Sequence, residues 1–279
     1  MMKLPSFSGK TVLVTGASSG IGRETALAFA RAGAQVVMVA RRAEALTEVE
    51  AQARKRHDAR TLVVPADVTR PAQVRACFRQ AVAAFGGVDV VVNNAGILIP
   101  SRVEDIRGAD LKAMLDVNLF GALYVMQQAA AVMRKQGRGN IVNVASLGGR
   151  RAFSPIGGYS ATKFALIGLT EAFRMELAGT DIHASLVLPG VIETPMVERT
   201  AASDDELGAL WPKALNMPAD WVVAAIFAAV RFNLRELSVP PGAGEISKLL
   251  AVAPAIGDSL IRMMTGAARA ASKLKRSAR

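Results

Sequence analysis

The chain has very few of the residues that build disulfides and metal sites. It contains one cysteine, Cys77, and two histidines, His57 and His183. A single cysteine excludes an intramolecular disulfide, and because Cys77 lies in a helical pattern we expect a packed, unreactive thiol. The two histidines lack the spacing of metal ligands, so the sequence predicts no metal site.

Long apolar runs are also missing. The most apolar stretch, Trp221–Val230, is ten residues long, whereas a membrane span needs about 18. The first residues, Met1–Ser6, contain no apolar core of a signal peptide. We therefore expect a cytoplasmic protein. Its 279 residues, 51% of them hydrophobic, suffice for one substantial core.

Aromatic residues are scarce: they make up 5% of the chain, with two tyrosines and two tryptophans, while the net charge is +11. A sequence pI near 10.4 would fit the electrostatic footprint of a nucleic-acid-binding protein. However, no nucleic-acid module is recognisable, and the basic residues outside the tail are spread over many helices. We expect no sequence-specific binding of nucleic acid; salt-sensitive binding without sequence preference would be electrostatic.

The chain does contain short apolar strands that alternate with amphipathic helices. Strands are expected to start near residues 10, 35, 61, 88, 139, 182 and 236. This alternation is typical of an α/β protein with a parallel sheet and helices on both faces. The sequence predicts one doubly wound domain with a seven-stranded parallel sheet over residues 1–240, followed by an extension over 241–279.

A glycine-rich turn follows the first strand. Lys10–Thr15 is short and apolar, Gly16 opens the turn, and a helix is expected from about Ile21 to Ala32. Glycines let the backbone approach a pyrophosphate, and a helix amino end offers free N–H groups and partial positive charge. The strand, turn and helix predict the first unit of a Rossmann-type dinucleotide site.

Three side chains with acid/base potential lie in the middle of the chain. Ser146 follows the apolar run Asn140–Ala145, and the carboxyl ends of parallel strands face the ligand crevice. Tyr159 and Lys163 are four residues apart, which places them on one helix face. A nearby ammonium is expected to lower the phenol pKa and make it a usable acid/base. Alternatively, Ser146 is a turn serine bonded to its own backbone.

Together these motifs resemble the short-chain dehydrogenase/reductase family over roughly residues 8–240. The matching residues are T-G-x-x-x-G-x-G at Thr15, Gly16, Gly20 and Gly22, N-N-A-G at Asn93–Gly96, then Asn118, Ser146, Tyr159, Lys163, Pro189–Gly190 and Thr194. The resemblance implies a catalytic set of Asn118, Ser146, Tyr159 and Lys163. In it, Tyr159 is the acid/base, Lys163 lowers its pKa and binds the nicotinamide ribose, and Ser146 polarises the substrate oxygen. Asn118 would anchor a proton-returning water chain, although a helix asparagine can also simply bond neighbouring backbone.

The resemblance also implies the cofactor-binding residues. They are Gly16, Ser18, Ser19, Gly20, Ile21, Gly22, Arg41, Asp67, Val68, Asn94, Ala95, Gly96, Tyr159, Lys163, Pro189, Gly190, Ile192 and Thr194.

The end of the second strand predicts which dinucleotide is bound. Gln35–Ala40 is followed by Arg41 and Arg42, with no carboxylate at the strand tip. An acidic residue there would accept the 2′-hydroxyl of NAD, whereas a guanidinium binds the 2′-phosphate of NADP. We expect NADP(H) to be preferred over NAD(H), unless both arginines are merely solvated. Asp67 would contact adenine or, alternatively, cap the next helix before Pro71.

A substrate lid is expected at about 191–218. Its apolar residues are Met196, Leu207, Leu210, Trp211, Leu215 and Met217, beside Asp204–Glu206. They fit either a hydrophobic substrate or ordinary packing. Arg150 and Arg151 would meet an anionic substrate or be solvated loop charges, and we favour the latter.

The extension is basic and amphipathic. Residues 245–279 carry seven basic and two acidic residues, a net charge of +5. The basic residues are Lys248, Arg262, Arg269, Lys273, Lys275, Arg276 and Arg279. The apolar residues among them are Leu249, Leu250, Val252, Ile256, Leu260, Ile261, Met263 and Met264. Such a segment fits peripheral contact with the inner face of a membrane or packing on a partner subunit.

The sequence thus predicts an NADP(H)-dependent oxidoreductase that interconverts a carbonyl and an alcohol on a lipophilic small molecule. The family's members pair through the helices expected at Leu111–Arg134 and Tyr159–Ala178, which implies a homodimer or homotetramer. The alternative is a non-catalytic dinucleotide-binding scaffold that associates with membranes through its tail.

Overall fold

A computed structural model describes residues 5–57, 59–203 and 216–252, together with residues 255, 258, 259 and 263. Its centre is a parallel sheet in the strand order β3-β2-β1-β4-β5-β6-β7. The strands are β1 (Thr11–Thr15), β2 (Gln35–Ala40), β3 (Thr61–Pro65), β4 (Val90–Asn93), β5 (Arg138–Val144), β6 (Asp181–Pro189) and β7 (Glu236–Val239). The predicted seven-stranded, doubly wound sheet is confirmed.

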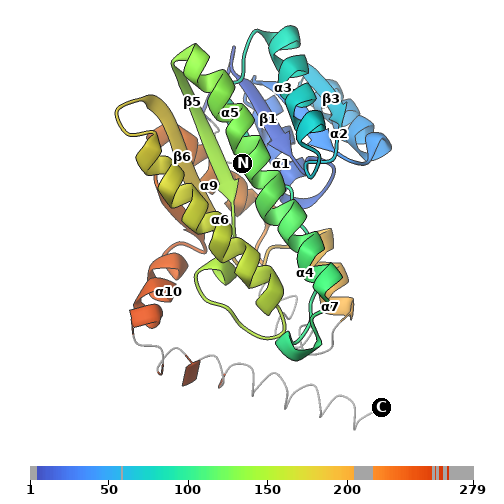
Figure 1. The fold of residues 1–279 in the computed structure, drawn as a ribbon. Helices are drawn as coiled ribbons and strands as arrows, with labels where there is room; N and C mark the ends of the chain where they lie inside the picture. The colour runs from blue at the N-terminus through green and yellow to red at the C-terminus, as the bar shows by residue number, and fades with distance from the viewer. Residues whose placement is uncertain are drawn as a thin grey trace.

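Helices cover both faces of this sheet (Figure 1). They are α1 (Gly20–Arg31), α2 (Ala43–His57), α3 (Pro71–Phe85), α4 (Gly108–Leu115), α5 (Ala122–Gln136), α6 (Gly157–Glu176), α7 (Pro195–Ser203), α9 (Ala219–Phe232) and α10 (Ala243–Val252). Three short segments complete the order: η1 (Val103–Asp105) and η3 (Leu147–Gly149) are 3₁₀ turns, and η2 (Asp116–Gly121) is π-helical.

Alternating strand residues feed two separate cores. Val12 and Val14 of β1 face α1, α2 and α9, whereas Leu13 between them faces α3, α5 and α6. Side chains of a strand alternate between faces, so a sheet buried on both sides needs continuous apolar strands. This explains why β1 and β2 are apolar along their length. Because neighbouring strands are parallel, their carboxyl ends lie at one edge of the sheet.

Helices α4–η2 and α6 lie against each other on the front face of Figure 1. These contacts lie within one molecule, so the pairing of subunits through the same helices stays a prediction. None of the helices in the described ranges combines the length and apolarity that crossing a bilayer requires.

Candidate active site

The glycine-rich loop between β1 and α1 depends on its glycines. Gly16 and Gly20 have φ of +68° and +53°, a region that favours glycine over residues with a Cβ. A Cβ on Gly22 would lie 2.3 Å from the carbonyl oxygen of Gly16. The N-cap Ser19 makes no side-chain cap bond, and the first turn of α1 holds no acidic residue. The amino end of α1 can therefore receive an anion.

Thr15 and Asn94 hold this loop against the end of β4. Thr15 Oγ1 accepts hydrogen bonds from the backbone N–H groups of Asn94 and Ala95 at 2.9 and 3.0 Å. Asn94 Nδ2 donates to the carbonyl of Thr15 at 3.1 Å. These bonds join the ends of two neighbouring strands, so the backbone around the loop is fixed before any ligand binds.

A cleft of about 430 Å³ opens above the loop. Twelve of the predicted cofactor-binding residues line it: Gly16, Ser18, Ser19, Gly20, Ile21, Arg41, Asp67, Val68, Asn94, Ala95, Gly96 and Thr194. The other six, Gly22, Tyr159, Lys163, Pro189, Gly190 and Ile192, are not among its lining residues. Gly22 is buried against Gly16, and Ile192 is 2% exposed in the core.

Eight further residues line the cleft that were not among the predicted cofactor-binding residues. They are Ala40, Arg42, Ala66, Ile97, Val117, Pro195, Met196 and Arg199; Met196 was expected in the lid instead. Most are neighbours in sequence of predicted residues and could have been found that way. Arg199 could be found only from helical spacing, because it lies one turn beyond Pro195 and Met196 on α7.

Arg41 and Asp67 stand at the end of the cleft formed by β2 and β3. Arg41 is exposed and lines the cleft, and Arg42 donates to Ser18 Oγ at 3.5 Å. The alternative role for Asp67 as a helix cap is wrong, because the N-cap of α3 is Arg70. Asp67 Oδ1 instead accepts from the backbone N–H and hydroxyl of Thr69, both at 2.9 Å.

Ser146 and Tyr159 meet at the carboxyl end of β5. Ser146 Oγ accepts from the N–H of Gly148 at 3.0 Å and lies 3.4 Å from the carbonyl oxygen of Pro189. The Ser146 side chain also acts on the phenol of Tyr159, on the first turn of α6, and lowers the pKa of that phenol against the effect of burial. Ser146 is thus a turn serine bonded to nearby backbone, as the alternative predicted. The same side chain also acts on the phenol of Tyr159.

Lys163 lies beneath Tyr159 on the same face of α6. It is 4% exposed, and its Nζ donates to the carbonyl of Val144 at 3.0 Å. The same Nζ lies 5.7 Å from the centre of the Tyr159 ring. Lys163 is therefore a buried ammonium anchored to Val144 at the end of β5. Val144 lies two residues before Ser146 in sequence.

Burial dominates the pKa values of this pair. It raises the pKa of Tyr159 to about 12, against the opposing effect of the hydrogen bond with Ser146. It lowers the pKa of Lys163 to about 8. The net pKa of Tyr159 therefore lies above its ordinary value, not below it as expected, because desolvation outweighs the hydrogen bond. The phenol is consequently protonated at neutral pH. The effect of Lys163 on this pKa stays a prediction.

Asn118 sits in the π-helical segment between α4 and α5. Its Oδ1 accepts from the N–H of Ile97 at 2.8 Å, and its Nδ2 donates to the carbonyl of Ile97 at 2.9 Å and to Thr162 Oγ1 at 3.0 Å. The bonded backbone is 21 residues away, so Asn118 does more than bond its own helix. A Cβ on Gly96 would lie 3.2 Å from Asn118 Oδ1 and 3.7 Å from Lys163 Nζ. The four predicted catalytic side chains therefore surround one place beside the cleft.

Arg150 does not behave as predicted. Its side chain is only 17% exposed and forms ion pairs with Glu171 at 2.6 Å and with Glu236. It is therefore neither a solvated loop charge nor a ligand for an anionic substrate. Arg151 likewise pairs with Asp258.

The predicted lid is described only at its two ends. Ile192 and Met217 form an isolated β-bridge, and Glu193 N donates to the carbonyl of Met217 at 2.9 Å. Met196 lines the cleft, and a Cβ on Gly190 would lie 3.2 Å from Met217 Cε. Leu207, Leu210, Trp211, Leu215 and Asp204–Glu206 lie outside the described residues.

The extension begins with α10, whose Ile246, Leu249 and Val252 are exposed. Lys248 pairs with Glu236 at 2.8 Å. The other basic residues predicted for the tail, Arg262, Arg269, Lys273, Lys275, Arg276 and Arg279, lie outside the described residues, as do Ile256, Leu260, Ile261 and Met264.

Comparison with known proteins agrees with this geometry. The family model described as short chain dehydrogenase matches residues 10–205. An uncharacterized oxidoreductase of Staphylococcus haemolyticus is 32% identical over 238 residues, covering 85% of this chain and all of the relative.

Two solved structures share the fold over most of their length. Levodione reductase is 30% identical with a TM-score of 0.80, covering 86% of this chain and 99% of its own. A short chain dehydrogenase/reductase from Burkholderia phymatum in complex with NAD is 25% identical with a TM-score of 0.82, covering 92% of this chain and 97% of its own. The glycine-rich loop, the cleft and the family match lead to one conclusion: the chain belongs to the short-chain dehydrogenase/reductase family, as a dinucleotide-binding oxidoreductase.

Proposed function

We propose that this protein is an NADP(H)-dependent oxidoreductase that interconverts a carbonyl and an alcohol on a lipophilic small molecule. The observation that carries the proposal is the meeting of Ser146, Tyr159 and Lys163 beside the cleft above the glycine-rich loop. A non-catalytic scaffold would have no need for this buried hydroxyl, phenol and ammonium, so the scaffold alternative is not favoured.

The residues of the cleft fit a dinucleotide. The amino end of α1 would hold the pyrophosphate, and Arg41 would hold the 2′-phosphate of NADP(H). When bound, NADP(H) supplies or accepts the hydride. The NAD complex of the Burkholderia neighbour shows that its fold also accepts NAD, so the preference for NADP(H) rests on Arg41.

Each catalytic side chain has one task in the reduction of a carbonyl. Ser146 Oγ holds and polarises the carbonyl oxygen, and the phenol of Tyr159 donates its proton to that oxygen. A protonated phenol is the form that reduction requires, and its raised pKa keeps it in that form. Lys163 stabilises the resulting phenolate. Asn118 would anchor the water chain that returns protons to Lys163. Oxidation uses the same groups in reverse.

The substrate is proposed to be lipophilic because of the apolar side chains near the site. Met196 lines the cleft, and Met217 lies against Gly190 at the end of β6. Levodione reductase, by its name, reduces a carbonyl compound, which supports a carbonyl substrate for this chain.

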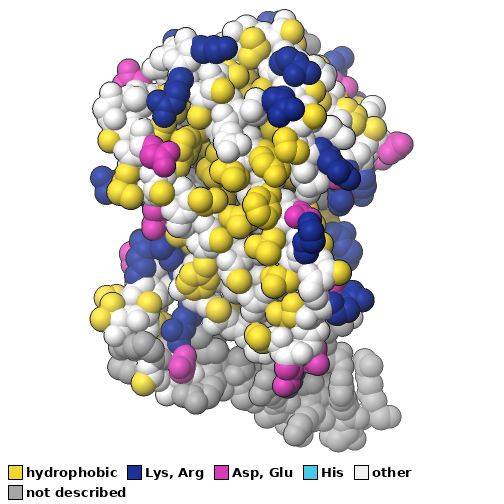
Figure 2. Space-filling view, viewed as in Figure 1, with side chains coloured by type: hydrophobic (Ala, Val, Ile, Leu, Met, Phe, Trp, Pro, Cys, Tyr) yellow, Lys and Arg dark blue, Asp and Glu magenta, His cyan; other side chains and the backbone are white. Residues whose placement is uncertain are grey.

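A homo-oligomer is proposed to form through the front face of the molecule. Hydrophobic side chains gather there in Figure 2 over α5 and α6. Phe120 of η2 and Phe164 and Met175 of α6 are 44%, 44% and 72% exposed. A second copy that covers them would remove apolar surface from water. Sedimentation analysis of Phe164→Glu against the wild type tests this, with a smaller species expected for the variant.

We propose that the protein is cytoplasmic. Its carboxyl-terminal extension is proposed to contact either the inner face of a membrane or a partner subunit. Deletion of residues 253–279, which keeps α10, followed by co-sedimentation with anionic liposomes separates the two. Loss of co-sedimentation supports the membrane, and an unchanged absence of co-sedimentation supports the subunit.

The decisive experiment follows NADPH oxidation with ketones and aldehydes of increasing chain length. Tyr159→Phe is expected to lower kcat/KM by about 10²–10⁴-fold, the usual contribution of a general acid. Tyr124→Phe on α5 is the matched control, since Tyr124 is the other tyrosine of the chain and does not line the cleft. Equal rates for wild type and Tyr159→Phe would exclude Tyr159 as the acid.

A further inference from the structure

Arg199 on α7 lines the cleft but has no task in the catalytic set. In the described part of the chain, the cations that line the cleft are Arg41, Arg42 and Arg199, and the acidic residue is Asp67. Arg41 and Arg42 follow β2 at one end, beside Asp67 after β3. Arg199 comes from a different wall, so its charge serves a different part of the ligand.

The start of α7 is fixed by Thr194. Its hydroxyl donates to the carbonyl of Ile192 at 3.2 Å, and its carbonyl accepts from the N–H of Glu198 at 3.0 Å. Pro195, Met196 and Arg199 all line the cleft, and residues with these spacings share one helix face. Arg199 is therefore held on the cleft side of α7, one turn beyond an anchored helix start.

This helix start packs on the glycine-rich loop. A Cβ on Gly20, the first residue of α1, would lie 3.1 Å from Thr194 Cγ2 and 3.9 Å from Pro195 Cδ. The amino end of α1 holds no acidic residue in its first turn. Arg199 thus lies one helical turn beyond the start of α7, which contacts the amino end of α1. The free N–H groups at that amino end can bind a pyrophosphate.

The guanidinium of Arg199 is available for a ligand. The residue is exposed, and within the described residues no hydrogen bond or ion pair engages it. Arg23 on α1 differs, because it bonds Glu24 and Gln52. An unpaired arginine beside an anion site can form two parallel hydrogen bonds with phosphate oxygens.

We propose that Arg199 binds the pyrophosphate of the dinucleotide from the side of α7, opposite the glycine-rich loop. This inference rests on the proposed function. The dinucleotide then contacts both α1 and α7. Arg199 contributes equally to NADPH and NADH, because both carry the pyrophosphate, whereas Arg41 separates them.

The test compares Arg199→Ala, Arg199→Lys and the control Arg79→Ala, which removes an exposed arginine of α3 outside the cleft. Fluorescence titration gives Kd for NADPH, NADH and 2′,5′-ADP, which has the 2′-phosphate but no pyrophosphate. For Arg199→Ala, Kd is expected to rise about ten-fold for both dinucleotides, and by less for 2′,5′-ADP, which keeps only one phosphate of the pyrophosphate. Arg199→Lys is expected to retain part of the affinity, and Arg79→Ala all of it.

Three results separate the inference from the proposed function. Wild-type affinity of Arg199→Ala for both dinucleotides overturns the role of Arg199. A loss confined to NADPH and 2′,5′-ADP also overturns it, because it assigns Arg199 to the 2′-phosphate. Failure of the wild-type protein to bind any dinucleotide overturns the proposed function instead. If Arg199→Ala does not fold, as judged by Tm, Arg199→Lys decides by the same comparison.

Discussion

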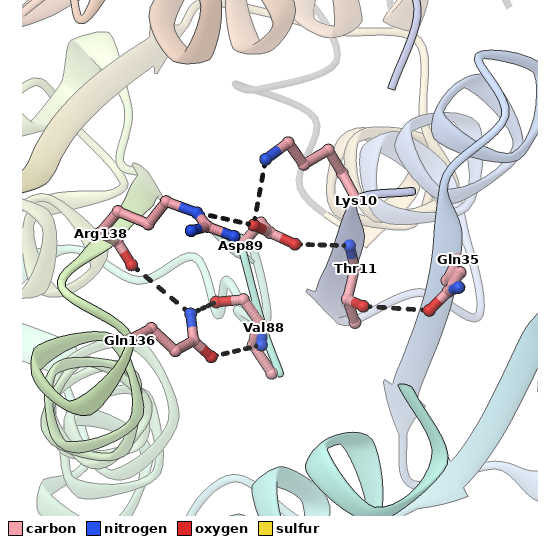
Figure 3. Close-up of polar contacts among 7 residues, drawn as sticks. All are labelled: Lys10, Thr11, Gln35, Val88, Asp89, Gln136 and Arg138. Atoms are coloured by element: carbon pink, nitrogen blue, oxygen red, sulfur yellow. Dashed lines mark hydrogen bonds and ion pairs between the residues drawn. The ribbon is translucent and has the colours of Figure 1, made fainter. Parts of the chain in front are cut away.

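The two edges of the central sheet use polar groups in opposite ways. At the carboxyl edge, the strands end in the glycine-rich loop, Arg41, Asn94 and Ser146, and several polar groups there face a cleft. At the amino edge, polar side chains bond one another and the ends of the strands. Figure 3 shows this second cluster, around Asp89 and Gln136.

Asp89 is the centre of the amino edge. Its Oδ2 accepts from the N–H of Thr11 at 3.0 Å, and its Oδ1 lies 3.3 Å from Lys10 Nζ and 3.6 Å from Arg138 Nε (Figure 3). Gln136, the last residue of α5, bonds the segment before β4: its side-chain amide exchanges two hydrogen bonds with the backbone of Val88 at 2.8 and 3.0 Å. The side chains at this edge hold strands together, whereas the carboxyl edge combines such bonds, at Thr15 and Asn94, with polar groups that line the cleft. The separation lets the site vary without loss of the sheet's connections.

The largest expected effect at the carboxyl edge comes from Gly22→Ala. Its Cβ would meet backbone at 2.3 Å, so the glycine-rich loop must move. Overpacking of this kind costs about 1–3 kcal/mol or more, and we expect dinucleotide affinity to fall by at least about 100-fold. Isothermal titration measures it. Gly108→Ala is the control, because nothing lies within 4 Å of its Cβ. Normal affinity of Gly22→Ala would show that the loop does not hold the ligand.

Arg41→Asp is expected to have the next largest effect. It places a carboxylate where the 2′-phosphate is proposed to bind, which repels NADPH and suits the ribose of NADH. The ratio of NADPH to NADH affinity should fall by at least about ten-fold, the loss of one charge-assisted hydrogen bond. Arg79→Asp is the control for general charge effects in the same fluorescence titration. An unchanged ratio would remove Arg41 from cofactor selection.

At the amino edge, Asp89→Ala is expected to change stability alone. It leaves the N–H of Thr11 without its acceptor and removes the partner of two cations. The free energy of unfolding should fall by about 1–3 kcal/mol, with the exposed Lys10 contributing little. Urea unfolding measures the loss, and kcat/KM should stay within about two-fold. Asp105→Ala, at an exposed position of η1, controls for net charge. A large loss of activity without a loss of stability would contradict the division between the edges.

The smallest effect concerns the pH dependence of stability at Lys163. Burial lowers its pKa from 10.5 to about 8. Between these values the unfolded chain keeps a proton that the folded protein has released, so this residue's contribution to stability rises with pH. Tyr159 acts in the opposite direction only above its ordinary pKa of 10.

Lys163→Met removes the dependence on Lys163. The difference in unfolding free energy between wild type and Lys163→Met should therefore shift in favour of the wild type from about pH 8 to about pH 10. The shift is at most about 1.4 kcal/mol per pH unit. Urea unfolding of both proteins measures it, and a constant difference would mean that Lys163 is not desolvated.

Much of the fold could be predicted from the sequence because its signals are local. Apolar strands and glycine turns gave the strand starts to within two residues, for example 88 against Val90 in β4. The glycine-rich loop and the spacing of Tyr159 and Lys163 are local as well. Their predicted neighbourhood is present in the structure, whereas their roles in catalysis remain predictions.

What could not be predicted depends on contacts between distant segments. Arg150 pairs with Glu171 and Glu236, which are 21 and 86 residues away. Asn118, in the π-helical segment, bonds Ile97 and Thr162, which are 21 and 44 residues away. The pKa of Tyr159 follows from burial, which no sequence spacing encodes. Arg199 lines the cleft because α7 starts beside Gly20, the first residue of α1.

The ion pairs of Arg150 have a consequence for the carboxyl-terminal extension. Arg150 directly follows η3, the turn after Ser146, and shares Glu236 of β7 with Lys248 of α10. A truncation inside α10 that removes Lys248 would take one cation from Glu236, whose other partner, Arg150, lies four residues downstream of Ser146 in sequence. The boundary of any shortened form of the enzyme therefore belongs after Val252 rather than at the end of β7.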